Sequence, residues 1–346
     1  MTTFNKKELA DKFKTVASVI NSSAIIEILK SVKISVDGDK FTMTGANGEI
    51  QITTNGECSG SDKFDVCADT KSFALMLQSS KDQIDIKLTG DKLATVSGKS
   101  KFNIQTLPSD MYPIIESAGA FNNMPLDLLI GNVYKGAPKK HVQQALMGVL
   151  LQSDGSKINA VSTNVQMCMI NEIQAESDAF EVIVPNAAAE YFANNKTDGF
   201  YIDEGKLVAI NNETSTKIVC RLIDGQFPKW QRIIPDNKES FTVNKKELND
   251  SMSIIAKMDQ STGSRWIGEN GEMQILSGAK SGSSFSRSID FSGDDFKINL
   301  SPELFSICMT LFDSEDLTIH FNQSNPKQPI KAICDNKMFV IAPLLI

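Results

Sequence analysis

The chain has 346 residues, of which 41% are hydrophobic and 22% are charged. These proportions are typical of a folded globular protein and exclude a largely disordered chain. The length exceeds what one hydrophobic core usually supports, which predicts two or three domains of about 100 to 150 residues. The formal net charge of −7 argues against a protein that binds nucleic acid tightly through ion pairs, because such proteins usually carry a net positive charge.

The sequence predicts a cytoplasmic protein with no membrane contact. Its longest apolar runs, ALMGVLL at 145–151 and FVIAPLLI at 339–346, are much shorter than the roughly 18 to 20 residues that span a bilayer. The six cysteines form no C-x-x-C pair, and a chain of this size does not need disulfides to fold. We therefore expect the cysteines to be reduced and mostly buried.

The first predicted helix follows the pentapeptide NKKEL at residues 5–9. Leu9, Phe13 and Val16 lie at positions i, i+4 and i+7, which is one apolar face of an amphipathic helix. The same pentapeptide recurs at residues 244–248 and is followed by the equivalent stripe of Leu248, Met252 and Ile255. One five-residue match could arise by chance, so further landmarks are needed.

A weaker copy of this helix lies midway between the two pentapeptides. The stretch NMPLDLLIGNVYKG begins at Asn123 and carries Leu126, Ile130 and Val133 at the same spacing. The pattern therefore predicts three copies of one unit, each about 115 to 120 residues long. Repeats of this length are whole domains rather than solenoid modules.

A second landmark recurs at a constant interval. Strands of the type F-x-V/I begin at Phe64, Phe180 and Phe296, which are 116 residues apart (180 − 64 and 296 − 180). Each strand runs into a helix start, at Asp69, at Pro185-Asn186 and at Ser301-Pro302. The second landmark thus supports three units independently of the pentapeptide.

Tight turns between alternating hydrophobic segments form the third landmark. Asp-Gly, Glu-Gly, Asn-Gly and Gly-Asp turns predict hairpins in VDGDKFTMT, LTGDKLATV, QSDGSKINAV, DEGKLVAI and ENGEMQIL, and a proline-containing variant occurs in NQSNPKQPIKAIC. The predicted order is strand, helix and hairpin strands, used twice per domain. We therefore predict an α+β protein with three similar domains, at residues 1–117, 118–238 and 239–346.

Three stretches resemble the bacterial β sliding clamp, the processivity subunit of DNA polymerase III: SGKSKFNIQTLPSDMYPII at 97–115, RLIDGQFPKWQRIIP at 221–235 and the terminal FVIAPLLI. The resemblance follows the whole chain in order and marks a divergent member of that family. It implies a DNA clamp fold, in which two such chains form a head-to-tail homodimer, a ring with helices lining the hole and sheets outside. The implied function is to encircle duplex DNA, independently of its sequence, and to tether the replicative polymerase.

The resemblance also implies a groove that binds short peptides of its partners, namely a DNA polymerase III alpha subunit or a phage-type polymerase, and the clamp loader. The matching positions are Leu146, Thr163, Gln166, Pro228, Arg232, Ile233, Val340, Ile341, Ala342, Pro343 and Leu344. The chain departs from the family pattern where Val165, Gln166, Met167 and Cys168 replace Gly, His, Arg and Leu, and where Leu345 replaces Arg. These changes predict a more apolar and less basic groove with an altered peptide preference.

Helical spacing places several lysines opposite the predicted core stripes, where a ring would expose them to DNA phosphates. The residues expected to face DNA are Lys7, Lys14, Lys135, Lys139, Lys140, Lys246 and Lys257. The alternative interpretation is an ordinary solvated helix face. Because encirclement is topological, little binding energy to DNA is needed, which reconciles these contacts with the net negative charge.

No signature of an enzyme is present. The chain has only two histidines, His141 and His320, and lacks the spacings of zinc sites, phosphate-binding loops and nucleophile elbows. We therefore expect a processivity factor without intrinsic catalysis, metal or cofactor. The alternative is a repeat-built, β-rich structural or binding protein that does not encircle DNA.

Overall fold

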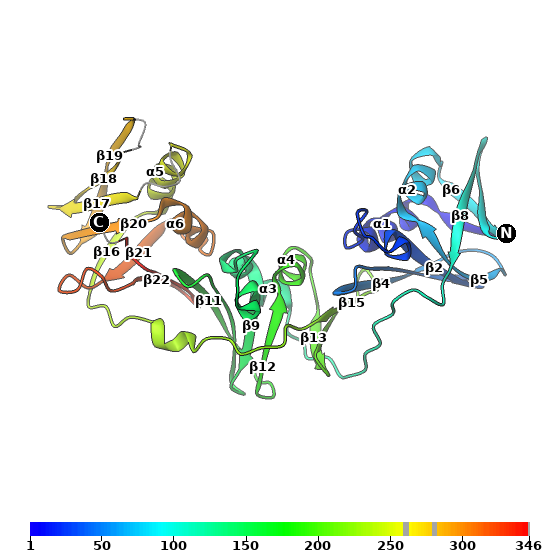
Figure 1. Cartoon of the computed structure of the whole chain (residues 1–346), viewed down its shortest axis with the longest axis horizontal. Coiled ribbons are helices and arrows are strands. Elements are labelled where there is room, and N and C mark those ends of the chain that lie inside the picture. The colour runs from blue at the N-terminus through cyan, green and yellow to red at the C-terminus, as the bar shows by residue number, and fades with distance from the viewer. Residues whose placement is uncertain (259–262, 279–281, 345–346) are drawn as a thin grey trace. The chain divides into compact units, whose positions relative to one another are not determined.

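The computed structural model describes residues 1–258, 263–278 and 282–344. The chain forms two compact units, one of residues Met1–Pro125 with Lys196–Leu222 and the other of Leu126–Asn195 with Ile223–Ile346. In each unit, antiparallel strands form one long sheet and helices pack beside it (Figure 1). No helix within the described ranges is long and apolar enough to cross a membrane.

The first unit contains an 11-stranded sheet in the order β1-β6-β7-β8-β5-β2-β3-β4-β15-β14-β13. Its strands are β1 (Thr2–Asn5), β2 (Ser31–Asp37), β3 (Lys40–Ala46), β4 (Ile50–Glu57), β5 (Lys63–Asp69), β6 (Gln83–Thr89), β7 (Lys92–Ser97), β8 (Ser100–Pro108), β13 (Gly199–Asp203), β14 (Lys206–Asn211) and β15 (Thr216–Arg221). Its helices are α1 (Lys6–Ala17), α2 (Thr70–Ser79) and the short 3-10 helix η1 (Glu27–Lys30). Helices α1 and α2 lie side by side, with the Phe13 and Phe73 rings stacked 5.1 Å apart (Figure 1).

The second unit contains a 12-stranded sheet in the order β12-β9-β10-β11-β23-β22-β21-β16-β19-β18-β17-β20. Its strands are β9 (Gly148–Ser153), β10 (Lys157–Thr163), β11 (Met167–Gln174), β12 (Phe180–Pro185), β16 (Glu239–Asn244), β17 (Ser264–Glu269), β18 (Glu272–Gly278), β19 (Ser284–Gly293), β20 (Phe296–Leu300), β21 (Asp316–Phe321), β22 (Ile330–Cys334) and β23 (Lys337–Ile341). Its helices are α3 (Leu126–Ile130), α4 (Asn186–Asn194), α5 (Lys245–Met258) and α6 (Pro302–Met309), with 3-10 turns η2 (Gly131–Gly136), η3 (Gln144–Met147) and η4 (Trp230–Ile233).

The asparagine of each NKKEL motif caps a helix in the same way. The Oδ1 atoms of Asn5 and Asn244 accept the main-chain N–H of the glutamate three residues on, both at 3.1 Å, which satisfies a donor that the helix leaves free. The predicted apolar stripes of α1 and α5 are buried. In the middle copy the stripe is also buried, but Gly131, at φ +43°, ends α3 after five residues and a 3-10 turn follows.

The second landmark is confirmed as a strand followed by a helix in all three copies. Strands β5, β12 and β20 lead directly into α2, α4 and α6. Asp69 and Ser301 cap α2 and α6 by accepting main-chain N–H groups, whereas Pro185 precedes α4 without a side-chain cap.

The predicted hairpins are confirmed as well. Two-residue turns join β2 to β3, β6 to β7, β13 to β14 and β17 to β18, while β9–β10 and β21–β22 have longer connections. Gly205 and Gly271 have φ values of +78° and +85°, a backbone conformation that glycine adopts without strain. The recurring landmarks are therefore local structures, each encoded by its own short segment.

The sheets continue across the predicted domain limits. Strand β15 pairs with β4 inside the first unit, and β11 pairs with β23 inside the second. The two units are thus defined by contacts and do not coincide with three domains at 1–117, 118–238 and 239–346. That three-domain division stays a prediction based on the repeats.

Candidate functional site

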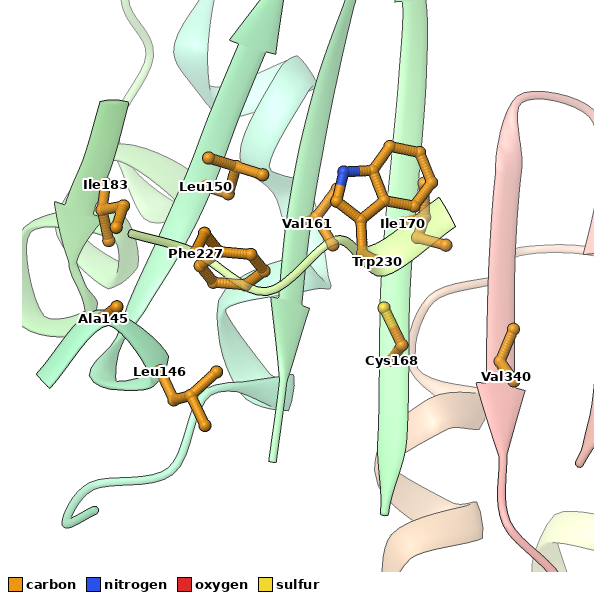
Figure 2. Packing of buried hydrophobic residues seen from close by; sticks show 10 residues of the cluster. All are labelled: Ala145, Leu146, Leu150, Val161, Cys168, Ile170, Ile183, Phe227, Trp230 and Val340. Atoms are coloured by element: carbon orange, nitrogen blue, oxygen red, sulfur yellow. The ribbon is translucent and has the colours of Figure 1, made fainter. Parts of the chain in front are cut away.

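An apolar cluster covers one face of the sheet in the second unit (Figure 2). Strands β9 and β10 each contribute one residue to this cluster and β11 contributes two alternate residues, and the segment 223–234 runs across them. The cluster consists of Ala145, Leu146, Leu150, Val161, Cys168, Ile170, Ile183, Phe227, Trp230 and Val340. We call this set the groove cluster and the segment 223–234 the strap.

The strap is fixed to the sheet at several points. Ile223 donates its main-chain N–H to the carbonyl of Ile183 at 2.9 Å, so the strap starts with a single β-bridge to β12. Trp230 is 8% exposed, and its indole Nε1 donates to Oε1 of Gln152 at 3.2 Å. Figure 2 shows the indole and the Phe227 ring lying over the strands.

The opposite face of the same strands belongs to the core under the helices. Met167 is 3% exposed, and its sulfur lies 3.5 Å from the Cys308 thiol of α6. The Phe339 and Phe305 rings are 5.8 Å apart. Because side chains alternate along a strand, Ile341 shares this face and is 0% exposed, whereas Val340 belongs to the groove cluster. The structure therefore separates two residues that the resemblance placed together.

The turn between β10 and β11 forms one end of the groove cluster. Thr163 is buried, and its hydroxyl donates to the carbonyl of Met167 at 2.6 Å and accepts the N–H of Val165 at 3.1 Å. The carbonyl of Gln166 accepts the main-chain N–H of Ala342 at 2.8 Å, which ties the C-terminal segment to this turn. The hydroxyl of Thr163 is thus occupied within the turn.

The remaining predicted groove residues lie at the surface. Gln166, Pro228, Arg232 and Ile233 are exposed, and Ala342, Pro343 and Leu344 are half-buried. Leu345 lies outside the described residues. Within the described part of the chain, no carboxylate forms an ion pair with Arg232. The accessible residues are thus a guanidinium, Ile233 and the half-buried C-terminal side chains, which suit a peptide with a hydrophobic anchor and one polar or main-chain acceptor.

A separate cavity lies beside the C-terminal segment. Pro343 contributes to its wall, and the volume is about 500 Å³. The other walls are the start of β20, the β17–β18 turn and the connection between β21 and β22. The cavity is lined by a mixture of apolar and amide side chains, including Phe296, Phe321, Asn270 and Gln328. The groove cluster does not line it.

Most residues of the groove cluster were not predicted as site residues. Leu146 and Val340 were predicted, but Leu150, Val161, Ile170, Ile183 and Phe227 were not. Strands β9 and β10 are buried on both faces, and the non-alternating apolar run VLL at 149–151 was the available signal. It indicates a covered second face, although not which segment covers it.

All seven lysines expected to face DNA are exposed. Lys7 and Lys14 lie with Asp11 on the outer face of α1, and Lys246 and Lys257 lie with Asp250 on that of α5. Lys135 has its ammonium 6.0 Å from the Tyr134 ring centroid. Exposure agrees with phosphate contact and equally with a solvated face, so the role of these lysines stays a prediction.

The cysteines are free thiols, five buried and Cys334 half-buried, in agreement with the expectation that most are buried. Burial raises the pKa of Cys67, Cys168 and Cys220 to about 12, so these thiols stay protonated at neutral pH. Among the residues that the structure describes, no three or more His, Cys, Asp or Glu side chains are grouped to hold a metal ion.

Comparisons with known proteins agree with the resemblance noted in the sequence. The family model of the DNA polymerase III beta subunit, N-terminal domain, matches residues 2–116. The beta sliding clamp of Pseudomonas aeruginosa is 22% identical over 372 aligned positions, covering 99% of each chain. That of Streptococcus pneumoniae is 24% identical over 352 positions, covering 92% of this chain and 91% of its own.

Solved structures match the fold over the full chain. The DNA polymerase III subunit beta of Pseudomonas aeruginosa superposes with a TM-score of 0.91 at 18% identity, covering 100% of both chains. The DNA polymerase sliding clamp of Bacillus subtilis gives a TM-score of 0.92 at 17% identity, covering 100% of this chain and 99% of its own. The predicted α+β DNA clamp fold is therefore confirmed.

Proposed function

We propose that this chain, which belongs to the bacterial β sliding clamp family as a divergent member, is a DNA sliding clamp that holds a replicative polymerase on duplex DNA. The observation that carries the proposal is the correspondence over the whole length, in both sequence and fold, with beta sliding clamps. The threefold recurrence of a buried apolar helix stripe, a strand-to-helix junction and hairpins supports it from within the chain. We infer an accessory role in the cytoplasm, without catalysis or cofactor of its own.

A head-to-tail homodimer would complete the ring. Three domains per chain, at 1–117, 118–238 and 239–346, give six domains in a dimer. A head-to-tail contact between two chains forms a closed ring when the rotation that relates the chains is 180°. Two strands leave an edge for this contact. In the described ranges, residues 100–105 of β8 pair only with β7, and residues 284–290 of β19 pair only with β18. A second copy could continue the sheet at these edges.

Polymerase and clamp loader would dock at the groove cluster. The cluster itself is buried beneath the strap, whereas Arg232 and Ile233 at the end of the strap and the C-terminal residues 342–344 keep accessible surface. This arrangement supports binding of a short peptide that buries a leucine and an aromatic residue. Because both partners would use the same groove, they would compete for it on any one chain of the dimer.

Duplex DNA would pass through the ring without sequence-specific contacts. The exposed lysines of α1 and α5 are suited to weak phosphate contacts, which position the ring and still let it slide. The net charge of −7 then resides on other surfaces and favours solubility.

Two experiments test this function. Light scattering after size exclusion should give about twice the chain mass of 37.9 kDa, and a strictly monomeric species at micromolar concentration would contradict the ring. After treatment with the loader, the protein should stay on nicked circular plasmid and leave when the plasmid is linearised. Equal retention on both forms would indicate ordinary DNA binding instead of encirclement.

A further inference from the structure

The first unit has its own segment that crosses a junction between two copies of the repeat. Strand β4 of the first copy pairs with β15 of the second, and β11 of the second copy pairs with β23 of the third. We call these pairings the first and the second seam. Each seam has five residue pairs, and β15 and β23 both have a second neighbour in their sheets, so strand pairing alone makes the seams equal.

Residues 112–118, which we call the staple, begin on the first copy. The Tyr112 side chain is 4% exposed and packs against Ala46 and Cys67. Its hydroxyl lies 3.2 Å from the carbonyl oxygen of Ser31 and 3.3 Å from that of Thr44, and both can accept its hydrogen. These four partners belong to strands β2, β3 and β5, so this end of the staple moves with the first copy.

Three residues later the staple reaches the seam itself. The buried main-chain N–H of Ile115 donates to Oε1 of Gln51 at 2.7 Å, and Gln51 lies on β4 directly opposite Val219 of β15. The Ile115 side chain packs against Val219, Val208 and Tyr201 of the second copy. One residue of the staple therefore bonds to one side of the first seam and packs on the other side.

Polar side chains of the second copy hold the rest of the staple. The Nζ atoms of Lys206 and Lys217 donate to the main-chain carbonyls of residues 116 and 117 at 2.8 and 3.2 Å. Oδ2 of Asp203 accepts the main-chain N–H of residue 118 at 3.2 Å. Because these bonds involve charged groups that are partly buried, each is stronger than an ordinary surface hydrogen bond.

The link between the two ends is short. Only Pro113 and Ile114 separate Tyr112 from Ile115, and proline restricts the backbone further. The first seam therefore cannot part unless the staple also loses its hold on one copy.

The second seam is bridged more loosely. The strap is held on the second copy by Trp230, and the next bond to the third copy is from Nζ of Lys331 to the carbonyl of Pro235 at 2.8 Å. Four residues lie between these two points, and the first three of them, 231–233, are exposed. A longer, exposed link lets the two copies separate locally while both ends stay bound.

We propose that the staple is a conformational lock on the first seam, so that neighbouring copies within one chain separate and bend at the second seam. Opening of the first seam costs the strand pairing and one end of the staple, whereas opening of the second costs mainly the pairing. The lock is a property of the single chain and needs neither DNA nor a docked partner.

Hydrogen exchange of the full chain, followed by mass spectrometry, measures the opening of each seam. In the unaltered protein, peptides covering β15 should exchange about tenfold more slowly than those covering β23, after correction for intrinsic rates. Insertion of Gly-Gly between Pro113 and Ile114 keeps both ends of the staple but lengthens the link. Exchange of β15 should then become about tenfold faster, with β23 unchanged. The matched control inserts Gly-Gly between Ile233 and Ile234, which should change exchange of β23 by less than about twofold.

A second variant tests the lock without an insertion. Lys206→Gln combined with Lys217→Gln removes both ammonium donors and should also accelerate exchange of β15 several-fold. Its control, Lys92→Gln with Lys196→Gln, removes the same charge at exposed sites away from the staple and should leave both seams unchanged. Unchanged exchange of β15 in the folded insertion variant or in Lys206→Gln with Lys217→Gln would overturn the inference. Equal acceleration at both seams would also overturn it, because that result indicates general destabilisation.

Discussion

Leu344 donates its main-chain N–H to the carbonyl oxygen of Asn299 across 2.8 Å. Ile223 makes the same bond to Ile183, and Ile183 precedes Asn299 by 116 residues (299 − 183), the interval found between the repeated strands. In the first copy, Leu107 pairs with Cys67, a further 116 residues back (183 − 67). Each copy therefore closes in the same way, with the end of its last hairpin strand against the strand that precedes its second helix.

This closure explains how the C-terminal segment is held beside the groove. Ala342 binds the carbonyl of Gln166, and Leu344 binds that of Asn299, so two main-chain bonds fix a three-residue segment. In the second copy the chain continues past the equivalent bond of Ile223 as the strap. The groove is thus bounded by the strap, which follows the second copy, and by the C-terminal segment, which ends the third.

Replacing Ala342 by proline should loosen the C-terminal segment. Proline has no N–H to donate to Gln166, so one bond is lost and the free energy of unfolding should fall by about 1 kcal/mol. The affinity for a short peptide with leucine and phenylalanine anchors should fall about tenfold, because the groove loses a fixed edge. Urea unfolding and anisotropy measure the two effects. The matched control, Ala342→Ser, keeps the N–H, and if it weakened binding equally, the bond to Gln166 would not be the cause.

Trp230 should be the largest single contributor to the packing of the strap. Truncation to alanine leaves a cavity over β10 and β11 and should cost about 3 to 5 kcal/mol of unfolding free energy. The variant Gln152→Ala keeps the indole in place but removes its hydrogen bond, together with the exposed bonds of Gln152 to Gln231 and Glu181, which should cost about 1 kcal/mol. Urea unfolding of both variants tests this difference. Equal effects would mean that the hydrogen bond, rather than apolar packing, fixes the strap.

The elements that the sequence predicted well are those encoded locally. Asn5 and Asn244 each cap a helix by accepting the N–H of the residue three positions later. Such a cap depends on no distant part of the chain. The hairpin turns at Gly205 and Gly271 are equally local. A constant interval of 116 residues then showed which local units are copies of one another.

The groove was predicted less completely because it depends on long-range pairing. Cys168 and Val340 meet only because β11 pairs with β23 in one particular register. A family match indicates near which segments a residue lies, but not on which face of the sheet its side chain lies, as Ile341 demonstrates. Its burial on the far side of the sheet follows from strand alternation, which the sequence alone could have indicated once Val340 was assigned to the groove.

Lys7 and Lys246 are the lysines to replace first. Changing both to glutamate should weaken loading onto nicked plasmid several-fold and make its salt dependence shallower by about one unit per lysine replaced. Both side chains are exposed, so Tm should change by less than about 2 °C. The matched control is Lys40→Glu with Lys92→Glu, which changes the charge equally at exposed hairpin ends. If the control weakened loading as much, net charge and not the helix face would be responsible.

Burial of thiols should make the protein less stable in alkaline solution. The pKa of Cys168 and of Cys220 is raised to about 12 by burial, whereas a thiol in the unfolded chain titrates near pH 8.5. Between about pH 9 and pH 12 the unfolded chain has lost protons that the folded chain still holds, so the free energy of unfolding falls as pH rises; below about pH 8 these groups contribute no pH dependence.

Urea unfolding at pH 8 and pH 10, at one protein concentration, measures this dependence for Cys220. Between pH 8 and pH 10, the free energy of unfolding should fall by about 2 kcal/mol less in Cys220→Ala than in the unaltered protein, because the variant lacks one titrating thiol. The variant Val219→Ala removes a buried side chain that does not titrate and should lower stability equally at both pH values. The two variants therefore differ in the pH dependence rather than in the size of the cavity. A pH dependence that survives Cys220→Ala unchanged would contradict the assignment to this thiol.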